Sequence, residues 1–445
     1  MPLKGNNAGF YSCGPTVYNF AHIGNLRTYI FNDLLKRVLI YNGFKVKHVM
    51  NYTDVGHLTS DADTGEEKME LAAKRERKTA WQIAEEYIKA FEEDTAKLGI
   101  IPPDIKCRAT DHIKEQINLI KALEKKGYTY KTSDGIYFDT SKFKDYGKLA
   151  KLKKEGLKAG ARIAIGEKKH LTDFALWKFS PEGGKRDMEW KSPWGTGFPG
   201  WHIECSAMSM KYLGETFDLH TGAEDHIPIH HTNEIAQSEA ATGKQFVKYW
   251  IHGAFLNFSG GKMAKSAGTF VTLRDLISKN YNPLEFRYFC LTAHYRKQLS
   301  FTWENLDAAS NAFKHLKNKA SEIKNEKSSK GEELIKDYKE DFRNAINDDL
   351  DMPKAISLLW KTIESKELGS KEKLELIKEY DRIFGLNLLK EERLSIPDSV
   401  RVIAEEREKA RKSKNFRKSD ELRETLKSIG WGVDDTAEGP KIRKL

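Results

Sequence analysis

The first 55 residues show a strand–helix–strand pattern of apolar and polar positions. Residues 8–13 form a short apolar run that Gly14 and Pro15 interrupt. Residues 44–50 alternate between apolar and polar side chains, as a strand with one buried face does. Between these strands, apolar residues recur at the spacing of a helix, which Gly43 would end: Leu26, Ile30, Leu34 and Val38. A strand, a turn and a helix N-terminus in this order form the phosphate-binding element of doubly wound folds.

Helical and strand patterns continue to alternate up to about residue 300. Helical periodicity covers residues 66–97 and 111–126. A second strand–helix–strand series follows at residues 216–220, 227–241 and 246–251. Strands that alternate with helices in this way are typical of a parallel sheet covered by helices.

The region between these two series has a different character. Residues 128–201 are mixed in pattern and contain many glycines, and we interpret them as an insertion into the nucleotide-binding domain. After Phe301 the pattern is almost wholly helical. We therefore predict an α/β fold with a Rossmann-type doubly wound parallel sheet and an insertion, followed by a C-terminal α-helical bundle. The predicted domains are 1–300, with the insertion at about 100–200 and a lysine-bearing loop at 262–266, then the bundle at 301–395 and a small basic region at 396–445.

The composition is that of a soluble globular enzyme. Of the 445 residues, 39% are hydrophobic and 31% are charged, which excludes a disordered chain. No run approaches the roughly 18–20 apolar residues that cross a bilayer. The first residues lack the charged-then-apolar pattern of a secretion signal. We expect a cytoplasmic monomer with no membrane partner.

The net charge of +10 and the pI of about 9.0 indicate a polyanionic partner. The excess is concentrated near the C-terminus, where residues 407–418 contain seven basic residues and one acid, Glu408. A solvated helix face is one explanation for this run. A nucleic-acid contact is the sharper one, because each neutralised phosphate releases a counterion.

Four residues far apart in sequence have the chemistry of a metal site. Cys13, Cys205, His230 and Glu234 offer the thiolate, imidazole and carboxylate ligands that zinc takes. His230 and Glu234 are four residues apart, which places them on one face of a helix, although His231 could compete as the imidazole ligand. The spacing does not match a compact zinc finger, so a metal here would join distant loops in a site for chemistry. The other two cysteines, Cys107 and Cys290, fit small buried hydrophobic residues, and four cysteines are too few for a disulfide framework.

Two short motifs carry further chemistry. His22-Ile23-Gly24-Asn25 lies where the first strand leads into the first helix, where an imidazole can stabilise negative charge on phosphate. Lys262-Met263-Ala264-Lys265-Ser266 follows two glycines, and its lysines could close over a triphosphate. Alone, the first motif could be a capping segment and the second a surface lysine cluster.

Together and in this order, the motifs resemble those of class I aminoacyl-tRNA synthetases, His-Ile-Gly-His and Lys-Met-Ser-Lys-Ser. More narrowly, the chain resembles the cysteinyl-tRNA synthetases, over nearly its whole length. The matching segments are Cys13–Tyr18, Asn51–Asp54, Gly200–Met208, His230–Ser238 and Asn347–Ala355.

The resemblance implies one bound zinc ion held by Cys13, Cys205, His230 and Glu234. It also implies ATP-dependent attachment of L-cysteine to tRNA(Cys) through a cysteinyl-adenylate. Zinc would select cysteine over serine, because it binds the substrate sulfur as a thiolate that a hydroxyl cannot imitate at neutral pH. A purely structural zinc is the alternative, since four protein ligands usually close a site.

The same resemblance assigns roles to the remaining site residues. The catalytic residues would be His22, Asn25, Lys262 and Lys265. ATP, used with Mg²⁺, would be bound by His22, Gly24, Asn25, Gly222, Asp225 and Lys265. The amino acid would be bound by Gly14, Thr16, Thr53 and Trp201.

The chain departs from the family motifs at several points. Asn25 stands for the final histidine of the first motif and can still donate a hydrogen bond, so we expect activity with altered ATP contacts. Ala264 stands for serine in the lysine motif, which removes a hydroxyl but keeps both lysines. Ala223 interrupts a family glycine run, and residues 439–442 lack the usual tryptophan.

Two other functions share part of this pattern. An ATP-dependent ligase that joins cysteine to an amino-sugar, of the mycothiol type, would use the same zinc and ATP residues, but would need no basic helical region. A non-catalytic RNA-binding paralogue would have lost His22 or the loop lysines, and all three are present.

Overall fold

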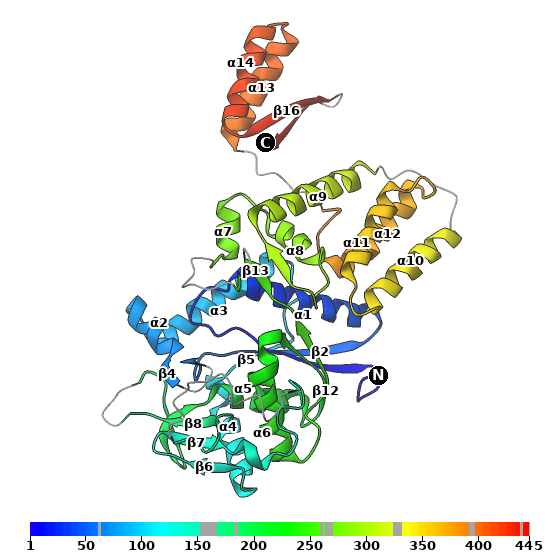
Figure 1. The fold of residues 1–445 in the computed structure, drawn as a ribbon. Helices are drawn as coiled ribbons and strands as arrows, with labels where there is room; N and C mark the ends of the chain where they lie inside the picture. The colour runs from blue at the N-terminus through cyan, green and yellow to red at the C-terminus, as the bar shows by residue number, and fades with distance from the viewer. Residues whose placement is uncertain are drawn as a thin grey trace. The chain divides into compact units, whose positions relative to one another are not determined.

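The computed structural model describes the chain except residues 61–63, 152–166, 182–185, 259–260, 263–269, 324–331, 391–396, 437–438 and 445. Its contacts divide the chain into two compact units, Met1–Leu389 and Lys390–Leu445 (Figure 1). The helices after residue 301, expected as a separate bundle, lie within the first unit up to Leu389. The division into three domains stays a prediction.

The centre of the first unit is the predicted parallel sheet, in the order β12-β11-β1-β2-β5. Its strands are β1 (Asn7–Ser12), β2 (Lys45–Tyr52), β5 (Ile105–Arg108), β11 (Phe217–Ala223) and β12 (Val247–Gly253). From edge to edge, this is chain order 3-2-1-4-5, which confirms the doubly wound fold. The order reverses between β1 and β11, and ligands of such folds bind at this switch point, beyond the carboxyl ends of the strands.

Helices cover both faces of this sheet (Figure 1). Three of them contact its strands: α1 (Ile23–Tyr41), α3 (Ala80–Lys97) and α5 (Trp201–Leu213). Next to these, α2 (Lys68–Glu76) packs on α3, and α4 (Ile113–Lys125) and α6 (Thr232–Thr242) pack on α5. The helical pattern at 66–97 is broken into α2 and α3, because Arg77 takes a left-handed conformation and Thr79 caps the next helix. A short hairpin of β3 (Leu58–Ser60) and β4 (Thr64–Glu67) precedes α2.

The helix expected at 227–241 begins differently. A 3₁₀ turn at Glu224–His226 leads into a π-helical turn at Ile227–His231, and regular α-helix starts only at Thr232. Single π turns within helices widen the turn and often occur at functional sites. Here the π turn carries His230 and His231.

Between β5 and α5 the chain builds a second sheet that is wholly antiparallel, in the order β6-β7-β8-β10-β9. Its strands are β6 (Thr129–Lys131), β7 (Gly135–Phe138), β8 (Phe174–Phe179), β9 (Trp190–Ser192) and β10 (Gly195–Pro199). It forms a core of its own with α4, α5 and α6, including Phe138, Trp177 and Ile203. The insertion is thereby packed on the helices that carry Cys205 and Glu234.

The rest of the first unit is mainly helical. A three-stranded sheet of β13 (Leu256–Phe258), β14 (Gly261–Lys262) and β15 (Leu299–Phe301) accompanies the helices, and its third strand follows the first two helices in the chain. These are α7 (Leu273–Ser278), α8 (Pro283–Leu291), α9 (Trp303–Glu322), α10 (Glu332–Asn347), α11 (Met352–Glu364) and α12 (Ser370–Phe384). The buried Arg287 of α8 ties this region to α1: its guanidinium donates to Asp33 Oδ2 at 2.5 Å and to the carbonyl of Phe384 at 2.6 Å.

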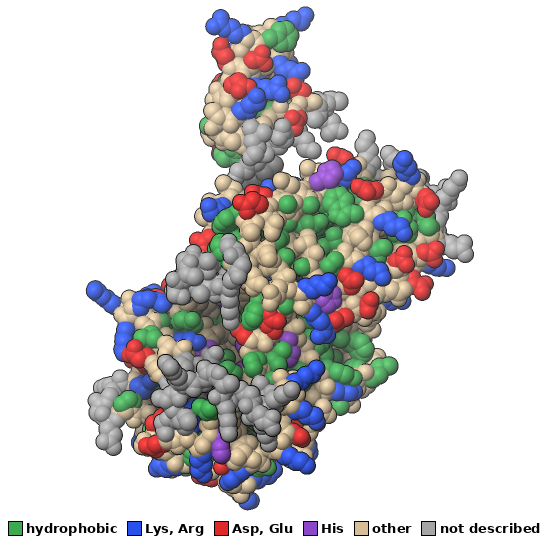
Figure 2. All heavy atoms as spheres, in the orientation of Figure 1, with side chains coloured by type: hydrophobic (Ala, Val, Ile, Leu, Met, Phe, Trp, Pro, Cys, Tyr) green, Lys and Arg blue, Asp and Glu red, His purple; other side chains and the backbone are tan. Residues whose placement is uncertain are grey.

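The second unit consists of α13 (Asp398–Lys412), α14 (Phe416–Ser428) and a hairpin of β16 (Trp431–Thr436) and β17 (Gly439–Lys444). Its small core contains Val400, Ala404, Leu426, Trp431 and Val433. In Figure 2, basic side chains lie among acidic ones on the visible face of this unit. Across the described ranges of both units, no helix combines the length and the apolar character that a membrane span requires.

Candidate active site and metal centre

The predicted site residues that the structure describes lie around one cavity of about 440 Å³ at the carboxyl edge of the parallel sheet. The lining includes Cys13, Gly14, Thr16, His22, Gly24, Asn25, Thr53, Trp201, Cys205, Gly222, Asp225 and His230. Glu234 lies behind them, fully buried. The side chain of Lys262 and all of Lys265 fall outside the described residues.

Four donor atoms converge at the base of this cavity. The ligand atoms of Cys13, Cys205, His230 and Glu234 all lie within 4.8 Å of one another, and all four residues are buried. Cys13 follows strand β1, Cys205 lies on α5, His230 lies in the π turn and Glu234 lies on α6. Oε1 of Glu234 lies 2.9 Å from Nε2 of His230 and accepts no hydrogen bond of regular geometry. Two such atoms facing each other are suited to a shared cation.

A second set of donors overlaps the first. Among the described residues, Cys13, His220, His231 and Glu234 also lie within 4.8 Å of one another. Nε2 of His220 lies 3.0 Å from the other carboxylate oxygen of Glu234, and Nε2 of His231 lies 3.4 Å from the sulfur of Cys13. Geometry alone therefore leaves His230 and His231 as competing imidazole ligands.

The electrostatics distinguish the two sets. Burial lowers the pKa of His230, but the charge of the Glu234 carboxylate and the interactions with Cys205 together outweigh burial and raise that pKa to about 10. Burial would raise the pKa of Glu234, but His220 and His230 lower it to about 2. Burial and the neighbouring His220 hold the pKa of His231 well below its usual range. Negative charge is thus concentrated on the side of His230.

The two thiols share one proton network. Burial would raise the pKa of Cys205, but hydrogen bonds with Cys13 and His230 lower it to about 6. Burial and the same contact with Cys205 raise the pKa of Cys13 well above its usual range. Cys205 is therefore the thiol that ionises first, and thiolate is the form that binds metal.

Aromatic rings hold His230 in place. The Trp201 ring stacks on His230 with a centroid distance of 4.2 Å, and on His57 at 4.0 Å. Nδ1 of His202 lies 3.0 Å from Nδ1 of His230. The sequence analysis missed His57, His202 and His220. His202 could have been found, because it lies between Trp201 and Cys205 in the matching segment Gly200–Met208.

Backbone approach explains two of the predicted glycines. A Cβ atom on Gly14 would lie 1.5 Å from the carbonyl oxygen of Asn51, so only glycine fits there. A Cβ on Gly222 would lie 2.6 Å from the ring of His231 and 2.7 Å from that of His226. Both glycines let the chain pass close to the cavity floor.

The side of the cavity where the sequence predicts amino-acid binding carries a hydrogen-bonded series of polar side chains. The hydroxyl of Thr16 lies 2.7 Å from Nδ1 of His57, whose Nε2 lies 2.6 Å from Nζ of Lys68. The amide of Asn51 donates to the hydroxyl of Thr53 at 3.0 Å, and its oxygen accepts from the Gly14 N–H at 2.9 Å. Thr16 and Thr53 are thereby fixed at the ends of adjacent segments, as positioning of a small polar ligand requires.

The side of the cavity where the sequence predicts phosphate binding begins at helix α1. His22 is its N-cap: Nδ1 accepts from the N–H of Asn25 at 3.1 Å, and Oδ1 of Asn25 accepts from the N–H of His22 at 3.3 Å. The His22 ring also packs edge-on against Phe270, at 5.5 Å between centroids. The N-terminus of a 19-residue helix favours phosphate.

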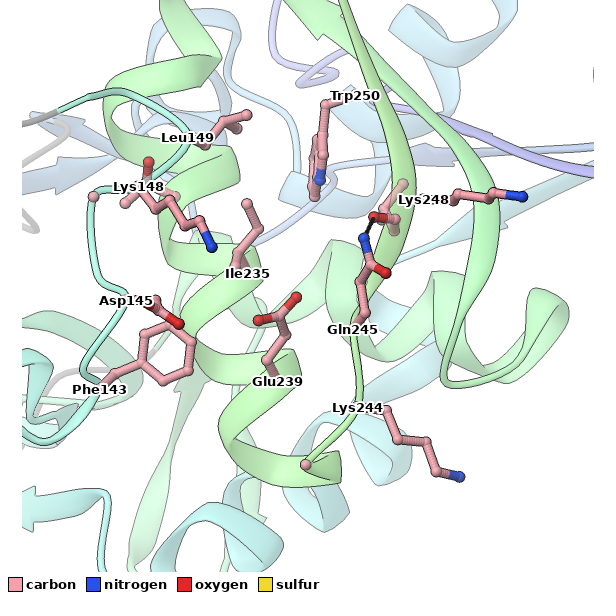
Figure 3. Close-up of a pocket in the computed structure, with 14 residues that line it drawn as sticks. Phe143, Asp145, Lys148, Leu149, Ile235, Glu239, Lys244, Gln245, Lys248 and Trp250 are labelled. Atoms are coloured by element: carbon pink, nitrogen blue, oxygen red, sulfur yellow. Dashed lines mark hydrogen bonds between the residues drawn. The ribbon is translucent and has the colours of Figure 1, made fainter. Parts of the chain in front are cut away.

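A separate cavity of about 590 Å³ lies on the opposite side of α6 (Figure 3). It is lined by Ile235 and Glu239 of α6, by Trp250 of β12 and by residues 143–149. Trp250 forms its link to the metal centre, because its ring stacks on His220 at 4.5 Å. None of the predicted site residues that the structure describes lines this cavity.

Comparison with known proteins agrees with this geometry. The family described as tRNA synthetases class I (C) catalytic domain matches residues 1–311. Cysteine–tRNA ligase 1 of Burkholderia lata is 50% identical over 99% of this chain and 93% of its own length. Cysteine–tRNA ligase of Treponema denticola is 45% identical over 100% of this chain and 97% of its own length.

Solved structures support the fold alone, at low sequence identity. Methionyl-tRNA synthetase of Mycobacterium tuberculosis with methionyl-adenylate is 14% identical, with a TM-score of 0.59 over 86% of this chain and 90% of that one. The leucyl-tRNA synthetase of Agrobacterium radiobacter in its ternary complex is 11% identical, with a TM-score of 0.62 over 87% of this chain and 85% of that one. With full-length relatives at 45–50% identity, the chain belongs to the cysteine–tRNA ligase family of class I aminoacyl-tRNA synthetases.

Proposed function

We propose that this protein attaches L-cysteine to tRNA(Cys) at the expense of ATP, acting as a cytoplasmic monomer. The observation that carries the proposal is the convergence of two thiols, an imidazole and a carboxylate at the base of a cavity whose opposite side is a helix N-terminus. One end of this cavity suits a thiol and the other suits phosphate.

The donor set fits zinc. Cys13, Cys205, His230 and Glu234 would hold the ion, and the low pKa of Cys205 supplies a thiolate near neutral pH. When bound, zinc would fix the sulfur of cysteine as a thiolate and so separate it from serine. The stacking of Trp201 on His230 keeps that imidazole oriented toward Glu234.

In the first step, a carboxylate oxygen of cysteine bonds to the α-phosphorus of ATP, and the bond to the bridging oxygen breaks as pyrophosphate leaves. Positioning and charge stabilisation do most of this work. His22 and Asn25 would orient the phosphates at the α1 N-terminus, Gly222 and Asp225 would border the adenosine, and Thr16, Thr53 and Trp201 would hold the amino acid. Lys262 and Lys265 would share the pyrophosphate charge with Mg²⁺.

In the second step, a ribose hydroxyl of the terminal tRNA adenosine attacks the carbonyl carbon of the adenylate. The ester bond forms, the hydroxyl proton is lost and AMP leaves. The tRNA body needs a cationic surface, which the second unit offers.

The basic run in this unit is divided between two roles. Arg407 is buried and donates two hydrogen bonds to Asp435, at 2.8 and 3.0 Å, and Arg411 also pairs with Asp435. These two arginines fasten α13 to the hairpin. The other exposed cations of the run are Lys409, Lys412, Lys414, Arg417 and Lys418. Lys412 and Arg417 also lie 3.7 and 3.3 Å from Glu408 and Glu421 of their own helices, as exposed pairs that a phosphate could replace.

The test is transfer of labelled cysteine to total tRNA, with ATP, Mg²⁺ and zinc present and serine as competitor. Cysteine-specific charging is the expected result. Cysteine-dependent ATP–pyrophosphate exchange without charging, together with ligation to an amino-sugar, would indicate the ligase instead. Loss of both activities would indicate a non-catalytic RNA-binding protein.

A further inference from the structure

A third cavity, of about 290 Å³, lies between the parallel sheet and helices α1 and α3. Its walls include apolar side chains such as Met50, Phe91 and Ile101. It is separate from the catalytic cavity, and Tyr29 lines both.

Asn32 makes this cavity unusual. It lies within α1, is 2% exposed, and neither atom of its side-chain amide has a hydrogen-bond partner among the residues that the structure describes. Asparagine is unfavourable within a helix, and a buried unpaired polar group costs about 1–3 kcal/mol. Both polar atoms of the Asn32 amide carry this cost, so we expect a ligand that forms hydrogen bonds with them.

His48 lines the same cavity with a second incomplete group. Its Nε2 lies 2.8 Å from the hydroxyl of Ser12, and its ring stacks on Phe10 at 4.2 Å. Within the described part of the chain Nδ1 has no partner, and the residue is 4% exposed. Burial, and then the charge of Lys36, hold the pKa of His48 well below its usual range, so the imidazole is neutral.

The charged groups of the cavity are already paired. Asp33 accepts from Arg287 and Arg37, at 2.5 and 2.7 Å. Glu92 accepts from the hydroxyl of Tyr52 at 2.9 Å and from Lys106 at 2.7 Å. The unmet groups are therefore neutral donors and acceptors, and the complementary ligand is neutral too.

We infer that this cavity binds a small, neutral, planar heteroaromatic molecule that presents a ring acceptor nitrogen beside an amino donor. A carboxamide pairs with such an edge through two hydrogen bonds, as asparagine does with adenine. The apolar walls then cover the ring faces. Ordered water is the competing occupant, and the experiment below distinguishes it from a bound ring.

The position of the cavity links its occupancy to catalysis. Ser12 lines it, and the next residue, Cys13, lines the catalytic cavity. In the same way, Tyr52 lines this cavity and the next residue, Thr53, lines the catalytic cavity. A ligand that moves β1, β2 or Tyr29 would therefore change the affinity for cysteine.

Binding is tested with 2-aminopyrimidine as the probe, by saturation-transfer NMR on the full chain with ATP, Mg²⁺ and cysteine at saturation. We expect transfer with a Kd on the order of 1 mM, as a ligand this small allows. The Asn32→Leu variant removes the carboxamide that would pair with the probe. Ala96→Phe blocks the cavity from the exposed side of α3. Both variants should abolish transfer. Asn311→Leu, on the exposed surface of α9, is the matched control and should leave it unchanged.

Absence of transfer to the unmodified chain would mean that the cavity holds water only, and would overturn the proposal. The proposal would also be overturned if transfer persists in both cavity variants. It would be overturned too if transfer occurs without ATP and is lost when ATP is present. The coupling rests on the proposed function and is measured separately, as the KM for cysteine in ATP–pyrophosphate exchange. A saturating probe should change that KM by about fivefold or more. An unchanged KM would contradict the coupling, while the NMR result reports the site whether or not the enzyme is active.

Discussion

His22 and Asn25 cap helix α1 reciprocally: each side chain accepts a hydrogen bond from the backbone N–H of the other residue. The asparagine that stands for the final histidine of the family motif is thus a working part of the helix end. Oδ1 of Asn25 accepts from the backbone N–H of His22, and Nδ1 of His22 accepts from the backbone N–H of Asn25. The cap fixes the imidazole at the edge of the cavity where phosphate is proposed to bind.

Replacing Asn25 by alanine should therefore affect both stability and ATP binding. Loss of the acceptor lowers the free energy of unfolding by about 1 kcal/mol. The freed His22 should also raise the KM for ATP in pyrophosphate exchange. Gln82→Ala breaks the same reciprocal cap at α3, between Thr79 and Gln82, outside the residues that line the catalytic cavity. It should lower the thermal midpoint similarly and leave the KM for ATP unchanged; equal KM values for both variants would contradict a role for Asn25 in ATP binding.

Cys205→Ser should remove the zinc. A serine hydroxyl stays protonated at neutral pH, whereas the pKa of Cys205 is lowered to about 6, after its hydrogen bonds outweigh burial. Zinc affinity should fall more than about 100-fold, because loss of residues that merely support ligands already costs 10–100-fold. Metal content by mass spectrometry after dialysis against a weak chelator is the measurement. Cys107→Ser, also buried but outside both donor sets, should retain zinc.

The two overlapping donor sets predict opposite results for adjacent histidines. If zinc takes Cys205 and His230, then His230→Ala should lose the metal, while His231→Ala should keep it with a smaller loss of affinity. Both variants are buried, so the comparison is matched in environment. Titration of each variant with a zinc-binding dye measures the affinity. Metal loss in His231→Ala alone would assign zinc to the set that contains His220.

Local pattern was enough to predict the elements that begin the fold. The apolar spacing at Leu26, Ile30, Leu34 and Val38 predicted α1, and Gly43 lies just beyond its C-cap, with a positive φ of 85°. The parallel sheet followed from the alternation of such helices with short apolar strands. The four candidate metal donors were proposed from their residue types and from the family resemblance, because thiolate, imidazole and carboxylate are the ligands that zinc takes.

Contacts between distant residues could not be predicted in this way. The π turn at 227–231 changes the phase of the helix that carries His230 and Glu234. The spacing of apolar residues in this segment does not predict such a turn. Asp435 pairs with Arg407 across 28 positions, because the hairpin folds onto α13. The sequence alone does not show this pairing, so all seven basic residues of the run were counted as available cations. His57 lines the cavity, where it lies against Thr16 and the ring of Trp201, a residue far along the chain.

The division of the basic run predicts two classes of variant. Replacing Lys412, Lys414 and Lys418 by glutamine should weaken tRNA binding and reduce the slope of log K against log salt by up to about 3, at roughly 0.9 per phosphate contact. Adenylate formation should be unchanged. Arg407→Gln should instead lower the stability of the second unit by about 1 kcal/mol, since Asp435 is partly exposed and the pair is partly screened. Normal tRNA affinity of the triple variant across a salt titration would contradict a phosphate-binding role.

The buried Asp54 gives the first unit a predictable dependence on pH. Burial raises the pKa of this carboxyl to about 6, and the hydrogen bonds that it accepts from the N–H and hydroxyl of Thr110 offset only part of that effect. In the unfolded chain the pKa is close to 4, so the folded state binds more protons between about pH 4 and pH 6, and stability falls as the pH rises through this window. Asp54→Asn keeps an acceptor for Thr110 but never ionises. Its thermal midpoint relative to the unmodified chain should therefore rise across the window, by the equivalent of up to about 3 kcal/mol, and stay level above it. A difference that is the same at pH 4 and pH 7 would show that Asp54 does not titrate in this range.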